Sequence, residues 1–163
     1  MSSPEDLEAF AIPSEPSKPP VTALEPTVSR ETKIAFLAHI LTGAPFMQRY
    51  EIATVGFVVF ATVSAAELDS IRFLACLGVP HGQRDDRLRA LMAVACVNRL
   101  EIDRHVIRPV KDRSWDSSFA YDDFVKSIPV GLLQIIESQY HEFSQTLALL
   151  ISKVTDRSFW PTP

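Results

Sequence analysis

The hydrophobic residues of the chain are most concentrated in residues 52–66, fifteen positions without a charged side chain. Seven of the fifteen are β-branched, and β-branched residues favour extended strands. A helix that crosses roughly 30 Å of hydrocarbon needs about 20 residues, so this passage is too short to span a membrane. We predict two short strands here, with a turn or bulge near Gly56, in a β-hairpin near residues 46–63.

Apolar residues at helical spacing predict a helix on each side of this hairpin. Before it, Ser29 can cap a helix that stops ahead of Gly43. After it, Ser64 and Glu67 have the spacing of a capping box, in which each residue bonds to the backbone amide of the other. The periodic apolar positions of these two helices are Ile34, Leu37, Ile40 and Leu41, then Leu68, Ile71, Leu74 and Ala75.

A third helical pattern follows "HGQRDDR" and extends to about residue 100 through Leu88, Leu91, Met92, Ala95 and Arg99. Residues 101–120 have no clear period. We predict a loop there, with a short extended piece around residues 105–110, and then a short helix over residues 121–128.

The strongest periodic signal belongs to the last predicted helix, where apolar residues recur at alternating spacings of three and four. This pattern is typical of an antiparallel helical packing or of a short coiled coil. Further apolar residues at 132, 135 and 149 widen the face, which favours packing in a domain core over an oligomer seam alone. The seam positions are Leu133, Ile136, Tyr140, Phe143, Leu147, Leu150 and Val154.

The chain divides into three parts by composition. Six of its twelve prolines fall within the first 26 residues, and proline lacks the amide donor that a helix needs. We therefore expect residues 1–28 to form an extended or disordered Pro-rich arm, and residues 29–155 to form a mainly α domain, a helical bundle with the small β-hairpin. Residues 156–163 form an aromatic C-terminal tail, whose Phe159 and Trp160 are able to dock on this domain or on a partner.

Charge and cysteine content limit the classes of protein that fit. The net charge of −4 and a pI near 5.5 argue against a nucleic-acid-binding protein, which usually has a basic face. Cys76 and Cys96 lie inside apolar helical patterns, so we expect buried free thiols in a reducing compartment. The acidic start "MSSPEDLEAF" lacks the pattern of a signal peptide, which points to the cytoplasm of the producing cell or of a host.

Catalytic and cofactor motifs are not apparent in the sequence. It contains no G-x-S-x-G elbow, no glycine-rich phosphate loop and no pair of histidines at metal-binding spacing. His81 and Asp85 could in principle ligate a metal, but a loop before a helix start explains them better. An enzyme site built from Asp103, His105 and Asp122 is the least favoured alternative. We expect no enzyme activity, no cofactor and no metal.

Three segments, "TVSAAELDSIRFLA", "VNRLEIDRHVIRP" and "VGLLQIIESQYHEFSQTLALL", follow the predicted hairpin in order. In this order the chain resembles the small assembly chaperones and baseplate-assembly proteins of tailed bacteriophages over about residues 46–155. It departs from their pattern in its longer proline arm and in "EIDRHVI", which lacks a glycine often found in that turn.

The resemblance implies binding without chemistry. It implies a tail or baseplate structural or assembly subunit, in the virion or the host cytoplasm, whose arm binds neighbouring protein subunits. No nucleic acid and no membrane span are expected, and a homo-oligomer is compatible with the pattern. The alternative is a cytoplasmic helical adaptor or regulator that dimerises through its last helix. The expected contact residues are Leu24, Val28, Phe57, Phe60, Phe159 and Trp160.

Overall fold

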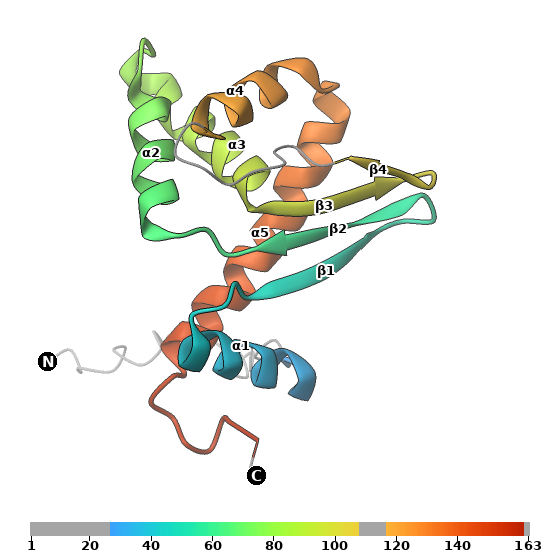
Figure 1. The fold of residues 1–163 in the computed structure, drawn as a ribbon, viewed down its shortest axis with the longest axis vertical. Coiled ribbons are helices and arrows are strands. Elements are labelled where there is room, and N and C mark those ends of the chain that lie inside the picture. Colours follow the sequence, from blue (N-terminus) through green and yellow to red (C-terminus); the bar gives the residue numbers. More distant parts are fainter. Residues whose placement is uncertain (1–26, 108–116, 162–163) are drawn as a thin grey trace, which may run out of the picture.

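The computed structural model describes residues 27–107 and 117–161, and these form a mainly α-helical structure with a small antiparallel sheet (Figure 1). The arm residues 1–26 lie outside the described part of the chain. The elements are α1 (Arg30–Thr42), β1 (Met47–Ile52), β2 (Gly56–Ala61), α2 (Ala65–Cys76), the 3₁₀ turn η1 (His81–Gln83), α3 (Arg84–Cys96), β3 (Val97–Ile102), β4 (His105–Ile107), α4 (Ser117–Ser127) and α5 (Val130–Ser152).

The predicted hairpin is present as β1 and β2, whose residues pair from Met47 with Ala61 to Ile52 with Gly56. Two further strands extend it into a four-stranded sheet in the order β1-β2-β3-β4. The prediction of a helix to about residue 100 is wrong, because α3 ends at Cys96 and β3 begins at the next residue.

A β-bulge explains why β3 has a helical sequence pattern. The pairing of β2 with β3 shifts between Val59 and Phe60, which leaves Asn98 as the extra residue. Val97 and Leu100 therefore both face the core although they are three residues apart. A spacing of three is typical of a helix, so the pattern alone points to the wrong element.

Both predicted helix starts are confirmed. The Ser29 side chain accepts a hydrogen bond from the Thr32 amide, and α1 ends at Gly43 with a left-handed φ of 71°. At α2, Ser64 and Glu67 form the complete capping box. The burial on α1 differs from its periodic pattern, because Phe36 is buried whereas Ile34, Ile40 and Leu41 are exposed.

The main core lies between the sheet and α5, which crosses the sheet as Figure 1 shows. The Phe143 ring of α5 stacks on Phe60 of β2 and on Phe46, with centroid distances of 5.6 and 6.0 Å. Ile136, Phe143 and Leu150 of the periodic seam are all buried. The interpretation of this helix as a core element is therefore confirmed.

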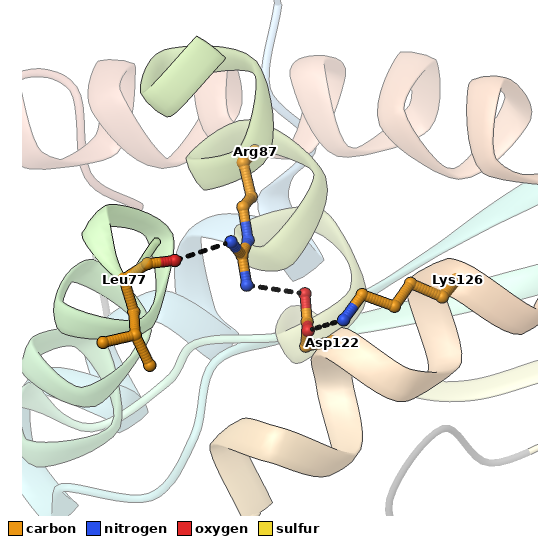
Figure 2. Close-up of polar contacts among 4 residues, drawn as sticks. All are labelled: Leu77, Arg87, Asp122 and Lys126. Carbon is orange, nitrogen blue, oxygen red and sulfur yellow. Dashed lines mark hydrogen bonds and ion pairs between the residues drawn. The ribbon is translucent and has the colours of Figure 1, made fainter. Parts of the chain in front are cut away.

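A second cluster joins α2, α3 and α4, and two ion pairs of Asp122, with Arg87 and with Lys126, lie beside it (Figure 2). One Arg87 nitrogen donates to Asp122 Oδ1 at 3.1 Å and the other donates to the Leu77 carbonyl at 3.1 Å. Lys126 contacts the second oxygen of Asp122. The Arg87 and Asp122 side chains keep only 24% and 11% of their surface exposed. This pair therefore connects the end of α2 to α3 and α4.

We expect Asp122→Ala to lower the free energy of unfolding by about 2 kcal/mol, because Arg87 would remain partly buried without its carboxylate. Asp123→Ala is the matched control: this neighbour on α4 is exposed, and we expect a change within about 0.5 kcal/mol. Urea denaturation followed by circular dichroism measures both. Equal stabilities of the two variants would show that the pair contributes nothing.

Two further observations concern the surface. Among the described helices, none is both long and apolar enough to cross a membrane. The prediction of two buried thiols is half right, because Cys96 is buried whereas Cys76 near the end of α2 is exposed.

Candidate functional site

The structure contains an apolar groove of about 510 Å³, which we call the α1/α5 groove. It lies where α1, the C-terminal half of α5 and the segment from β2 into α2 come together (Figure 1). Its volume falls within the range of ordinary ligand pockets. The lining residues are Phe36, His39, Ile40, Thr62, Val63, Leu68, Met92, Cys96, Tyr140, Phe143, Ser144, Leu147, Ile151 and Val154.

The groove forms because α5 is apolar on more than one side. Phe143 is buried in the core and borders the groove, and Leu147 and Ile151 line it one and two turns further along α5, followed by Val154 just after the end of the helix. Ile40 of α1 also lines the groove. Ile40, Ile151 and Val154 keep 48, 56 and 45% of their surface exposed, so the rim is apolar and open to solvent.

The position of α1 depends on aromatic contacts at its middle. The Phe36 ring packs edge-on against Phe46 at 5.5 Å and stacks on Trp160 at 6.0 Å. These contacts hold one wall of the groove against the core and against the C-terminal tail.

The groove is almost free of charge. Among its described lining residues there is no Asp, Glu, Lys or Arg, and the His39 ring contacts the carbonyl of Ala44. Burial raises the pKa of the Tyr140 hydroxyl to about 12, and the adjacent Cys96 thiol shifts it in the same direction. Tyr140 is therefore neutral at physiological pH. Such a surface suits apolar side chains of a peptide rather than a charged small molecule.

The raised pKa predicts a loss of stability at high pH. Above pH 10, tyrosine in the unfolded chain loses its proton while Tyr140 in the folded chain keeps it, so the free energy of unfolding should fall as pH rises from 10 toward 12. Burial also raises the pKa of the Tyr50 hydroxyl, the nearby Thr146 side chain opposes this shift, and the Glu142 charge adds to it. Urea midpoints measured between pH 8 and pH 11 test this, with Tyr140→Phe as the control that should show a smaller decline. The same decline in both proteins would contradict the assignment.

Three of the predicted contact residues lie together beside the first turn of α1. Val28, Phe159 and Trp160 border one shallow hollow, and all three pack against the main core. The Trp160 indole N–H donates to the Lys153 carbonyl at 3.0 Å. Lys33 donates to the Phe159 carbonyl at 2.7 Å, and its Nζ lies 3.8 Å from the centroid of the Phe159 ring. The aromatic tail thus docks on its own domain, and each ring keeps part of its surface exposed.

Phe57 and Phe60 lie on opposite faces of β2. Phe60 is 0% exposed, so we correct its assignment from a contact residue to a core residue: its position along the strand points it at α5. Phe57 faces outward beneath the guanidinium of Arg49, 3.7 Å from its ring centroid, with Arg99 at 5.5 Å. Leu24 lies outside the described residues.

The residues weighed for an enzyme site come from separate elements. Asp103 sits in the turn between β3 and β4 with a left-handed φ of 47°, and its amide donates to the Val55 carbonyl at 2.8 Å. Asp122 belongs to α4 and is bound by Arg87. In residues 27–107 and 117–161, no group of three or more His, Cys, Asp and Glu side chains is placed to hold a metal ion.

The groove was not predicted from the sequence, although part of its lining lies on the periodic apolar face of the last helix. Leu147 and Val154 belong to the periodic seam, but Ile151 lies off it. The clue in the sequence was that the apolar face of the last helix is wider than one packing partner can cover. The partner wall on α1 is more than 100 residues away in the sequence, so the two could not be joined without the fold.

No protein-family model, no curated protein and no solved structure matched this chain.

Proposed function

We propose that this protein is a non-enzymatic protein–protein interaction component of a tailed bacteriophage, a tail or baseplate structural or assembly subunit. The α1/α5 groove carries the proposal, because it joins exposed apolar side chains in an uncharged hollow. Exposed apolar surface of this kind is typical of sites where another protein docks. The bacteriophage setting comes from the resemblance in the sequence.

The shape and chemistry of the groove favour a peptide segment as the bound element. Its rim residues come from two helices, so the apolar side chains of a third helix or of an extended segment would enter between them. Aromatic and aliphatic anchors in such pockets contribute most of the binding energy of protein interfaces. His39, Thr62 and Ser144 are the polar residues able to orient a bound backbone.

In this proposal the domain is a helical-bundle body and residues 1–28 are an arm that reaches neighbouring subunits. Val28, Phe159 and Trp160 support a second contact surface, because they lie together where the arm joins α1. The protein would act in the virion or in the host cytoplasm.

The alternative, an adaptor or regulator that dimerises through its last helix, is less well supported. A dimer seam on α5 would use Ile136, Phe143 and Leu150, and these side chains are already buried against the sheet of the same chain.

The test replaces two rim residues of the groove in the full-length protein. Ile151→Asp with Val154→Asp places charge in an apolar site without touching the core, because both side chains are half exposed. We expect about a tenfold loss of the chain from purified particles, or an equal loss of infectious particles if the chain leaves after assembly.

The matched control is Val130→Asp, on the same helix but outside the groove and 71% exposed. It should support normal particles, and circular dichroism should show both proteins folded. Normal incorporation and normal infectivity of the double variant would reject the proposed function.

A further inference from the structure

The apolar rim residues Ile40, Ile151 and Val154 of the α1/α5 groove are about half exposed in the structure, and the chain's own sequence contains an apolar segment suited to this groove. Contiguous apolar surface is a liability for a protein that has to remain dissolved before assembly. Residues 1–26 are joined through Thr27 to the start of α1, which forms one wall of the groove.

Within the arm, which is expected to be extended or disordered on its own, residues 4–13, "PEDLEAFAIP", have the apolar spacing of a short helix that would form on binding. Leu7, Phe10 and Ala11 follow the i, i+3, i+4 spacing of one helical side. Acidic residues at 5 and 6 suit a helix start, and Pro13 suits its end. Phe10 supplies the aromatic anchor that a hollow of this size accepts.

The connecting segment is long enough to reach. The groove wall at Ile40 lies ten residues into α1, about 15 Å from the start of that helix at 1.5 Å per residue. Residues 13–26 comprise fourteen residues, and as Pro-rich chain they span up to about 43 Å. A tethered segment that reaches its site has an effective concentration of about millimolar, far above that of any dilute partner.

The geometry points to residues 7–12 of the same chain as the occupant of the groove in the free subunit. This inference rests on the proposed function for the role of the groove as a docking surface. It adds that the arm and the groove cover each other until assembly, so that a partner of either one has to displace the other.

A photo-cross-linking experiment on the full-length protein tests this directly. The amino acid p-benzoylphenylalanine replaces Phe10, which keeps an aromatic side chain at the anchor position. After irradiation at low micromolar concentration, we expect a cross-link within the monomer, mapped by mass spectrometry to residues 144–154, at and just after the end of α5, or to residues 36–40 of α1. The same photo-reactive residue at Val21, in the connecting segment, should not give this product.

The groove variant provides the second measurement. Ile151→Asp should reduce the cross-link about tenfold, whereas Val130→Asp should leave it unchanged. A cross-linked dimer would assign the groove to the arm of a second copy and overturn the inference. Labelling no stronger than the Val21 control, or labelling unaffected by Ile151→Asp, would also overturn it.

The cross-linking experiment and the particle experiment can reject the inference and the proposed function independently. The particle experiment reports what the groove does during assembly, and the cross-link reports what covers it beforehand. A cross-link in the otherwise unchanged protein, together with normal particles from the rim double variant, would reject the proposed function alone. Absence of the cross-link in the otherwise unchanged protein, together with defective particles from the rim double variant, would reject the inference alone.

Discussion

Replacement of Phe143 by alanine should lower the free energy of unfolding by about 3–5 kcal/mol, the cost of removing a buried aromatic ring and leaving a cavity. Phe143 is 1% exposed and contacts three aromatic neighbours, with ring centroids 5.6 Å away at Phe60, 6.0 Å at Phe46 and 6.3 Å at Tyr140. It therefore connects β2, the residue before β1 and α5. Urea denaturation followed by far-ultraviolet circular dichroism measures the loss.

Ile135→Ala is the control on the same helix. Ile135 keeps 41% of its surface exposed and belongs to neither core cluster, so its truncation removes less buried surface, and we expect a change of about 1 kcal/mol. The two variants also separate a core helix from a dimer seam. A Phe143→Ala protein of unchanged stability that no longer self-associates would place this residue between subunits and contradict the structure.

Gly56→Ala should destabilise the protein by about 3 kcal/mol, although it adds a single methyl group. A Cβ at this position would lie 1.8 Å from the Glu101 carbonyl oxygen and 2.8 Å from its carbonyl carbon. Both are backbone atoms of β3, so no side-chain rotation relieves the overlap, and the β2–β3 pairing has to separate. For a chain of this size the expected fall in Tm is about 6–12 °C.

Gly131→Ala is the matched control for glycine replacement. Gly131 lies in the first turn of α5, and an added Cβ there meets no atom within 4 Å. Alanine has the higher helix propensity, so this variant should be neutral or up to about 1 kcal/mol more stable. Thermal unfolding of both proteins gives the comparison. A Gly56→Ala protein as stable as Gly131→Ala would mean that the two strands are not in close contact at Gly56.

Local signals in the sequence were sufficient for several elements. Ser29 and Gly43 bound α1, and Ser64 with Glu67 starts α2, because a cap depends on residues three or four positions apart. The hairpin was predicted from the β-branched residues at positions 52–63, although β1 itself contains only Ile52 of these. The turn lies at residues 53–55, one step before the predicted Gly56, and Gly56 itself is required by the close approach of β3.

Long-range contacts decided the features that the sequence analysis missed. Strand β3 was predicted as the end of a helix, since a bulge at Asn98 gives its inward residues a spacing of three. The exposed and buried faces of α1 were set by Phe36, which packs against Phe46 and against Trp160 at the far end of the chain. Phe60 was predicted to contact a partner, whereas its neighbours on α5 bury it.

By itself, the sequence determined the features that depend on nearby residues: the helix caps, the hairpin and the wide apolar face of the last helix. It also determined the net negative charge. The tertiary structure alone decided where these parts meet, and hence that Ile40 and Ile151 face one groove from positions 111 residues apart. The physical reason is that periodicity records which side of an element is apolar, whereas burial depends on which other element covers that side.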